Sequence, residues 1–367
     1  MSVFSGLYQS KAGSSACLSA WFWPFRADIK GISGRLRQYL GTDACARNGG
    51  QYLGTEFTNI QWHSVLQWQL KHTLPMKNQI LTLTLFPIIL LLLVSCQQDQ
   101  NTSEPHSLFS EENLVAWCII PYDNQNRTAQ ERAEMLNELG FTKMAYDWRV
   151  EHLPDFPEEI HTLREHDIEL TAVWLWIDAR AAEEFLPEHN FIFDTLVEEE
   201  VSTRIWVGMH QNVYDELDDD EKVERVSEII HRIHERARES GSTVSLYTHQ
   251  GWLGIPENQV RVIEASGLDD LGIAFNFHHS YDQIDRFEEA LDIMMPWLET
   301  VNLNGMEKDG AHILDIGKGD YEKEMIQTLI ESGFSGNIGI IGHTYDEDVR
   351  EVLERNLEGL RGILGEI

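Results

Sequence analysis

The stretch TVSLYTHQGWLGIPENQVRVIEASGLDDLGIAFNFHH (243–279) decides the fold, because it contains one complete strand–helix–strand unit. Its two ends, TVSLYTH (243–249) and LGIAFNFHH (271–279), are short and nearly continuously apolar, as strands covered on both faces are. Between them, Pro256 marks the start of a helical segment. The stretch therefore predicts two neighbouring strands of a parallel sheet that helices cover.

The same unit recurs along the chain after residue 113. Six more apolar runs read as strands: LVAWCII (114–120), KMAYDW (143–148), ELTAVWLW (169–176), RIWVGMH (204–210), TVNLNGM (300–306) and NIGIIGH (337–343). Helices are expected in the gaps, with start signals at Thr128, Asp155, Asp219, Pro256, Asp282, Asp320 and Glu347.

Eight strands and eight helices in about 250 residues is the count of a closed β/α barrel. An open, doubly wound sheet is the alternative, and the regular eightfold repeat disfavours it. We predict an α/β fold, a (β/α)8 TIM barrel, as the domain 113–367, with the repeat running from about Leu114 to Leu364.

The segment before the barrel has the layout of an export signal. Met76 and Lys77 precede an apolar stretch over 80–94, and Leu93-Val94-Ser95-Cys96 resembles a bacterial lipoprotein box. We expect a signal segment at 76–96, lipidation at Cys96 and a polar tether at 97–112. An uncleaved membrane anchor is the alternative. Both place the barrel outside the cytoplasmic membrane, the first as an exported domain lipid-anchored to a bacterial membrane, on the periplasmic side or at the outer membrane.

The first 75 residues lack steady periodicity and contain the near-repeat RQYLGTDACARNGGQYLGTEF (37–57). Because an export signal works at an N-terminus, Met76 is a candidate start of translation. We expect the region 1–75 to be poorly ordered or no part of the mature protein.

The charge of the chain is uneven. The net charge is −33, residues 1–95 carry +5, and the remainder therefore carries −38. Such a surface repels phosphate backbones, so nucleic acid is not expected as a partner. The strand ends offer few cations besides Arg149 and Lys308, which disfavours phosphorylated sugars. The four cysteines fit neither a zinc site nor a disulfide framework, and Cys118 is expected to be a buried small residue.

Polar and aromatic side chains gather at the carboxyl ends of the predicted strands, which meet at one mouth of a barrel. One histidine alone is more often structural, but histidine ends four of these strands. We predict one shared site. The predicted catalytic residues are His249, His279, Asp147 and His343. The predicted substrate-binding residues are Trp117, Trp148, Arg149, Trp176, His210, Tyr247, Trp252, Asn276, His278, Asn302 and Asn304.

The residue types suggest the chemistry of this site. Histidine and aspartate exchange protons, and asparagine amides polarise hydroxyl or carbonyl groups. Trp117, Trp148, Trp174, Trp176 and Trp252 offer flat apolar faces to a sugar ring, although each of them is as readily explained as core filling. Trp174 and Trp176 share one face of their strand. The pattern favours proton transfer next to a sugar carbonyl.

Two segments carry a family resemblance. IGKGDYEKEMIQTLIESGFSGNIGIIGH (316–343) resembles the glycine-rich seventh loop, helix and final strand of the xylose-isomerase-like barrel superfamily. SLYTHQGWLGIPENQ (245–259) is similar to the fifth-strand segment of an exported subgroup. The resemblance spans about 114–364. It implies a sugar isomerase or sugar-phosphate epimerase that binds a divalent metal through Glu, Asp, His and Glu at strand ends.

The chain departs from that metal-binding pattern at each of these strand ends. The fifth-strand Glu is Tyr247, with His249 following, and the sixth-strand Asp-x-x-His appears as Asn276 and His279. The seventh-strand His becomes Asn302 or Asn304, and the final Glu falls at Gly342 or His343. Neutral donors offset little of the cost of dehydrating a hard cation. Binding of a divalent metal therefore stays an open alternative. The ligands of a zinc-like ion would be His210, His249, His279 and His343.

These observations predict an exported carbohydrate-active enzyme of the isomerase or epimerase type, or a keto-sugar lyase, with a small carbohydrate as its partner. The alternative is a non-catalytic sugar-binding lipoprotein that has lost the metal site of the family. A hydrolase is a further alternative, since a fold does not dictate a reaction.

Overall fold

The computed structural model describes residues 107–367. The predicted N-terminal region 1–75, the signal segment with Cys96, and the tether up to residue 106 lie outside the described residues. The part of the predicted tether that is described packs on the barrel, since Leu108 and Phe109 of the 3-10 turn Ser107–Phe109 are buried. No helix among the described residues has the length and apolar character needed to cross a membrane.

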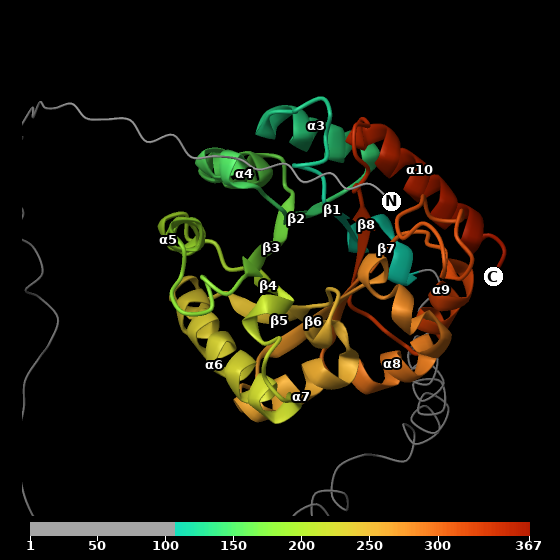
Figure 1. Cartoon of the computed structure of the whole chain (residues 1–367). Helices are drawn as coiled ribbons and strands as arrows, with labels where there is room; N and C mark the ends of the chain where they lie inside the picture. The colour runs from blue at the N-terminus through green and yellow to red at the C-terminus, as the bar shows by residue number, and fades with distance from the viewer. Residues whose placement is uncertain (1–106) are drawn as a thin grey trace, which may run out of the picture. The chain divides into compact units, whose positions relative to one another are not determined.

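Eight parallel strands form a closed barrel in the order β1 to β8, each hydrogen-bonded to the next and β8 to β1 (Figure 1). The predicted (β/α)8 fold is confirmed. The strands are β1 (Leu114–Trp117), β2 (Lys143–Tyr146), β3 (Glu169–Ile177), β4 (Arg204–Met209), β5 (Thr243–Tyr247), β6 (Leu271–Asn276), β7 (Leu298–Leu303) and β8 (Asn337–Ile341).

Eight α-helices surround the barrel among the described residues, and local sequence signals fix several of their ends (Figure 1). Thr128 forms a capping box with Glu131, and Asp218 forms one with Glu221. Gly140 ends the first of these helices with φ +85°, a conformation that glycine adopts at little cost. The helices are α3 (Ala129–Leu139), α4 (Phe156–Glu165), α5 (Pro187–Glu198), α6 (Asp219–Ala237), α7 (Pro256–Ser266), α8 (Phe287–Met294), α9 (Glu322–Glu331) and α10 (Val349–Leu364).

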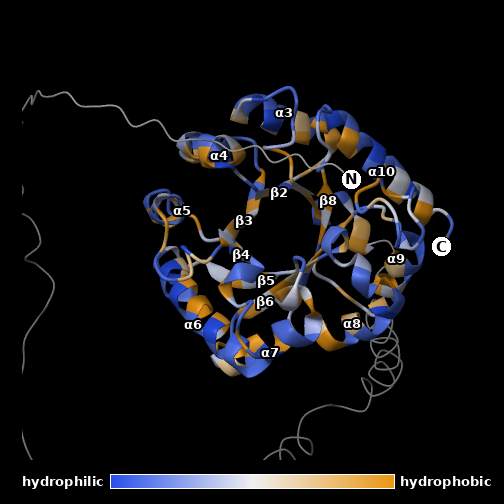
Figure 2. Cartoon of the chain, viewed as in Figure 1, coloured by the Kyte–Doolittle hydropathy of each residue, from blue (hydrophilic) through white to orange (hydrophobic). Residues whose placement is uncertain are grey.

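Two separate apolar cores hold the domain together. The larger core lies between the strands and the helices, whose surfaces mix apolar and polar residues (Figure 2). The smaller core fills the inside of the barrel with Trp117, Trp206, Tyr247 and small residues. The Trp117 and Trp206 rings meet edge to face, with centroids 4.9 Å apart. Bulky rings inside the barrel fill its centre, so a ligand of the barrel would bind at the mouth and not inside it.

Seven of the eight strands end earlier than the sequence predicted, and β3 ends one residue later, at Ile177, while most begin where expected. The predicted runs continued to Ile120, His249 and His279, whereas β1, β5 and β6 end at Trp117, Tyr247 and Asn276. The chain leaves the strand conformation at these points, since Cys118 has a φ of +56° directly after β1 and Phe277–His279 forms a 3-10 turn directly after β6. These residues form the loops at the mouth. The prediction was wrong at these strand ends because buried apolar residues such as Ile119, Ile120 and Phe277 continue the apolar pattern into the loops.

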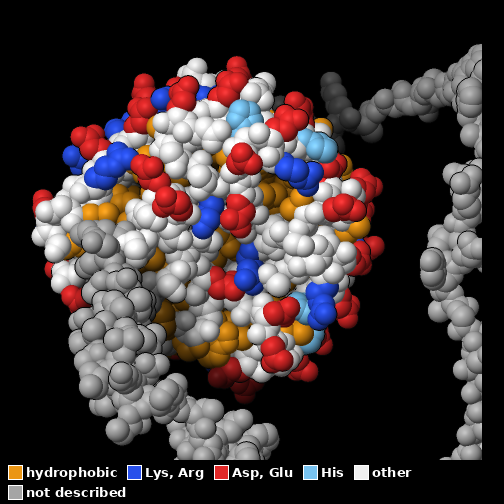
Figure 3. Space-filling model, turned by 180° about the vertical axis from the view of Figure 1, so that it is seen from behind, with side chains coloured by type: hydrophobic (Ala, Val, Ile, Leu, Met, Phe, Trp, Pro, Cys, Tyr) orange, Lys and Arg blue, Asp and Glu red, His pale blue; other side chains and the backbone are white. Residues whose placement is uncertain are grey.

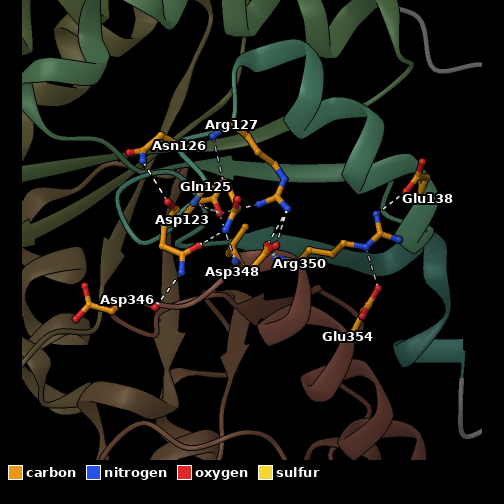
Figure 4. Close-up of polar contacts among 11 residues, drawn as sticks. Asp123, Gln125, Asn126, Arg127, Glu138, Asp346, Asp348, Arg350 and Glu354 are labelled. Atoms are coloured by element: carbon orange, nitrogen blue, oxygen red, sulfur yellow. Dashed lines mark hydrogen bonds and ion pairs between the residues drawn. The ribbon is translucent and has the colours of Figure 1, made fainter.

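Charged side chains join the loop after β1 to the loop after β8. Figure 4 shows Asp123 beside Arg127, whose guanidinium contacts Asp123 and Asp348 at 2.7 Å each. Asp123 is buried and also accepts hydrogen bonds from the backbone N–H groups of Gln125 and Val349. This network, which we call the seam, fixes the two loops where the barrel closes.

The outer surface of the barrel domain is predominantly acidic, in keeping with the net charge. Figure 3 shows acidic side chains spread over the face behind the view of Figure 1, with Lys and Arg side chains between them rather than gathered in a patch.

Candidate functional site

A cavity of about 160 Å³ lies at the mouth of the barrel. Residues at or just beyond the carboxyl ends of β1, β2, β5, β6 and β8, together with one residue inside β3, supply its walls. They are Trp117, Cys118, Tyr122, Asp147, Arg149, Trp174, Tyr247, His249, Asn276, His278, His279, Ile341 and His343. The closed topology thus brings six strands that are distant in sequence to one opening.

The cavity gathers many of the residues predicted from the sequence. All four predicted catalytic residues line it, namely Asp147, His249, His279 and His343. Of the predicted substrate-binding residues, the structure brings Trp117, Arg149, Tyr247, Asn276 and His278 to the cavity; Trp148, Trp176, His210, Trp252, Asn302 and Asn304 do not line it.

Asp147 is the buried carboxyl group of this cavity. It follows β2 directly and is only 2% exposed. One oxygen, Oδ1, accepts a hydrogen bond from the Ile120 backbone N–H at 3.4 Å, and the other, Oδ2, has no partner among residues 107–367. Burial raises the pKa of Asp147 to about 7, although the Arg149 guanidinium and the Ile120 N–H both oppose that rise. The side chain therefore exchanges a proton near neutral pH.

Four imidazole rings form a contiguous cluster across the cavity. The His249 and His279 rings lie 3.8 Å apart between centroids, His278 lies 4.1 Å from His279, and His343 lies 5.2 Å from His278. Burial, followed by repulsion between neighbouring rings, lowers the pKa of His249 to about 4 and lowers that of His279 further. Burial likewise lowers the pKa of His278 to about 4 and that of His343 to about 3. At neutral pH all four rings are uncharged.

Residues that the sequence did not predict for the site complete one wall. Tyr122, in the loop after β1, lies against the His343 ring with centroids 3.7 Å apart, and its hydroxyl accepts a hydrogen bond from Arg149 at 3.0 Å. Cys118 and Ile341 also line the cavity. The signal for Tyr122 is its position in a strand-to-helix loop of a barrel, where site residues concentrate. Cys118 is buried, as expected from its apolar run.

The predicted aromatic residues outside the cavity have other contacts. Trp148 packs in the outer core, and its indole N–H donates to the Trp174 carbonyl at 2.8 Å. Trp176 occupies the space over Gly208, where an added Cβ would lie 2.9 Å from the indole ring. Trp252 packs near Tyr214 and under the Lys222 ammonium.

Three polar residues predicted to line the site also lie elsewhere. His210 is exposed at the rim, where its Nδ1 accepts from the Asn212 N–H and its ring meets Trp176 edge to face. Asn302 is fully buried against Gly339, and neither of its amide atoms has a partner. Asn304 donates to the carbonyls of Gly305 and His312. The strand-end rule places these residues near the mouth but not in the cavity.

The mouth does not fit the divalent metal that the family resemblance implies. Asp147 is the only carboxylate in the cavity wall, and an oxygen-rich metal site needs several anionic ligands. The His249 and His279 rings lie against each other at an interplanar angle of 35°, a contact of ring faces and not of nitrogen atoms that converge on an ion. Within residues 107–367, no group of three or more His, Cys, Asp or Glu side chains is arranged to hold a metal ion.

The comparisons with known proteins support the fold. No family profile matches the sequence, and no curated protein matches it. The chain is similar to the crystal structure of 3-keto-D-glucoside 4-epimerase from E. coli, with 15% identity, a TM-score of 0.52, and coverage of 69% of this chain and 99% of the epimerase. It is also similar to D-psicose 3-epimerase from Clostridium cellulolyticum, solved with D-tagatose, with 14% identity, a TM-score of 0.52, and coverage of 69% and 98%. At this identity the likeness shows the barrel fold alone.

Proposed function

We propose that the mouth of the barrel catalyses isomerisation of a small neutral sugar by moving a proton from the carbon next to its carbonyl group to the carbonyl carbon. The observation that carries the proposal is Asp147, a buried carboxyl group whose pKa of about 7 and unpartnered oxygen suit it to take and return a proton at neutral pH. The similarity to barrels that include sugar epimerases also supports this chemistry.

The protonation states of the side chains in the cavity favour a mechanism with a single base. Ionised Asp147 removes the proton from the carbon beside the carbonyl, the C–H electron pair forms a C=C bond, and the carbonyl oxygen becomes an enediolate oxygen. Asp147 then returns the proton to the neighbouring carbon, while a hydroxyl proton passes from one sugar oxygen to the other. Neutral imidazoles assist as hydrogen-bond donors and relays. Inverting a carbon requires a second acid, and the lowered pKa values of the histidines disfavour imidazolium in that role.

The arrangement of the strands supports a ligand held between these groups. Asp147 follows β2, and His279 follows β6, so three strands separate them in either direction around the barrel. A sugar between them would meet the carboxyl group on one side and the imidazole cluster on the other.

The cavity suits a neutral sugar better than a phosphorylated one. Arg149 is the only cation among the lining residues, and its guanidinium is engaged by the Tyr122 hydroxyl and the Trp148 carbonyl. Trp117 and Trp174 offer indole rings, and the Trp174 N–H is buried without a partner, so it is available to a sugar hydroxyl. Export and lipid anchoring through Cys96 remain part of this proposal, on the strength of the signal-like segment 76–96.

Solvent-deuterium exchange tests the proposed reaction. The full chain, purified in detergent, is incubated in deuterium oxide with a panel of neutral aldoses, ketoses and keto-glycosides, and the deuterium beside the carbonyl is measured by NMR. We expect exchange with the wild type and a loss of about 10²–10⁴-fold with Asp147→Asn. The matched control is Glu299→Gln, which alters a carboxyl group near the amino ends of the strands that is bound by Ser245 and Arg204 and should retain the rate.

The outcomes separate the candidate functions. Exchange that Asp147→Asn leaves intact would remove the proposed base. Calorimetric sugar binding by the wild type without any exchange would instead favour the sugar-binding lipoprotein, which the missing metal carboxylates support.

A further inference from the structure

Tyr247 has a hydrogen-bonding pattern that leaves its own proton unused within the protein. The Trp117 indole N–H donates to the phenolic oxygen at 3.2 Å, and the Asn276 amide donates to the same oxygen. An indole nitrogen is only ever a donor, so the Tyr247 oxygen must be the acceptor of that bond.

The amide orientation of Asn276 is fixed independently. Its Oδ1 accepts a hydrogen bond from the His278 backbone N–H at 3.0 Å. The other end of the amide, which meets Tyr247, is therefore the NH₂ group and also a donor. Because all three partners are buried in the barrel mouth, water does not substitute for either bond.

A phenol that accepts two hydrogen bonds has one proton left to donate. Among the described residues the Tyr247 hydroxyl has no acceptor, and Tyr247 lines the same cavity as Asp147 and the histidine cluster. We infer that the Tyr247 hydroxyl is a catalytic hydrogen-bond donor, aimed by Trp117 and Asn276, that polarises the sugar carbonyl and stabilises the enediolate oxygen in place of a metal ion. This inference rests on the proposed isomerisation.

The chemistry of the position supports this role. Tyr247 stands where the family resemblance implies a metal-binding Glu, in a mouth whose residues do not fit a metal. As Asp147 takes the carbon proton, negative charge develops on the carbonyl oxygen, and a preoriented O–H on the buried Tyr247 stabilises that charge without reorganisation. Burial, reinforced by Cys118, keeps the pKa of Tyr247 well above its usual value, although the hydrogen bonds that Tyr247 accepts from Trp117 and Asn276 lower it. The phenol thus remains protonated through the reaction.

The first test compares two tyrosines. Tyr247→Phe should lower kcat for solvent-deuterium exchange by about 10²–10³-fold, the usual cost of losing one such donor, and change KM by less than about threefold. The matched control is Tyr146→Phe, because Tyr146 is equally buried but its hydroxyl donates to the His152 carbonyl outside the cavity. The control should keep the wild-type kcat. EDTA should change the kcat of neither variant. Circular dichroism and thermal unfolding verify that each variant is folded.

A second variant tests the aiming of the proton while keeping the tyrosine. Asn276→Asp replaces the NH₂ donor by an acceptor oxygen, so the Tyr247 hydroxyl would donate to that carboxylate and turn away from the ligand. Asn276 is a positioning residue, and its substitution should lower kcat about as much as Tyr247→Phe, with KM little changed. The double variant should be no slower than either single variant, because both remove the same interaction.

The results discriminate between the two levels of the proposal. A wild type that exchanges deuterium and a Tyr247→Phe variant with the same kcat would overturn the role of the phenol and leave the proposed isomerisation standing. Additive losses in the double variant would also overturn it. A wild type without exchange on any sugar of the panel would overturn both.

Discussion

The barrel mouth and the surrounding helix layer contain similar buried polar side chains, but these side chains differ in whether their polar atoms have hydrogen-bond partners. In the helix layer Glu159 is 3% exposed and forms a two-point ion pair with Arg132, at 3.0 and 3.3 Å. In the mouth Asp147 is 2% exposed, and one of its oxygens has no partner. The histidines differ likewise, since His234 binds Asp270 at 2.8 Å, whereas His279 Nδ1 is unpartnered.

The asparagines repeat this contrast. Asn356, on α10, accepts from the Ile316 N–H and donates to the Ile341 carbonyl, while both amide atoms of Asn302, inside the barrel but outside the cavity, lack a partner in the described part of the chain. Buried polar atoms without partners cost stability, and most protein interiors avoid them. Glu159, His234 and Asn356 therefore stabilise the helix layer, although His189 Nδ1 and Glu322 Oε2 on the helices are also unpartnered among residues 107–367. At the mouth, Asp147 and His279 keep atoms whose hydrogen bonds are left for a ligand, as expected for the loop end of this fold.

The largest expected effect is a pair of stability changes of opposite sign. The pKa of Asp147 is raised from 3.8 to about 7, so folding disfavours its charged form, and stability falls as the pH rises from about 4 to about 7. Asp147→Asn should therefore raise the free energy of unfolding by up to about 4 kcal/mol at about pH 8 and by little at about pH 4. Glu159→Gln should lower it by about 3 kcal/mol, because Arg132 loses its buried partner.

Urea unfolding at the two pH values measures both changes. If Asp147→Asn destabilised the protein at about pH 8 as Glu159→Gln does, the two carboxylates would be equivalent and the contrast between mouth and helix layer would fail.

The second effect is the pH dependence of catalysis. As the proposed base, Asp147 must be ionised, so kcat/KM for deuterium exchange should fall about tenfold per pH unit below about pH 7, or about 100-fold by about pH 5. The histidines, with pKa values of about 4 or lower, remain neutral over that range. A profile that stays flat down to about pH 5 would contradict Asp147 as the base.

The third effect compares substitutions of His279, at the mouth, and His234, in the helix layer. His279→Asn should lower kcat for exchange by about 10–100-fold, because a hydrogen bond to a charged transition state is lost, and should leave stability nearly unchanged at neutral pH. His234→Asn should leave kcat unchanged and lower the free energy of unfolding by about 1 kcal/mol through the contact with Asp270. Kinetics and urea unfolding of the two variants test this, and equal kinetic losses would refute it.

Much of the fold was predictable because its signals are local. Seven of the eight strands begin at the first residue of the predicted run, and only β7, at Leu298, begins earlier. Apolar runs buried on both faces and capping residues such as Thr128 act over a few positions, so a single sequence displays them. The meeting of Asp147, His249, His279 and His343 followed from barrel closure alone.

The remainder of the site depends on turns that periodicity does not reveal. His210 was expected to join the other histidines, but β4 ends at Met209 and the imidazole caps the turn Gln211–Val213. Trp174 lines the cavity while Trp176, two residues on, packs over Gly208, although both share one face of β3. Tyr122 reaches the cavity from a loop. These outcomes depend on loop conformation and on the size of neighbouring side chains, which lie beyond the strand pattern.

The smallest expected effect concerns the seam, where charges at the mouth are partnered. Arg127 is partly exposed and links buried Asp123 to Asp348 (Figure 4), so Arg127→Met should lower the free energy of unfolding by about 1 kcal/mol, and Arg127→Lys by less. Both variants should keep kcat, because the seam holds loops and its residues do not line the cavity. Urea unfolding and exchange kinetics measure the two quantities. A variant that lost kcat while keeping full stability would show that the seam positions the site. The presence of a hydrogen-bond or ion-pair partner would then no longer distinguish polar groups that stabilise the fold from those that serve a ligand.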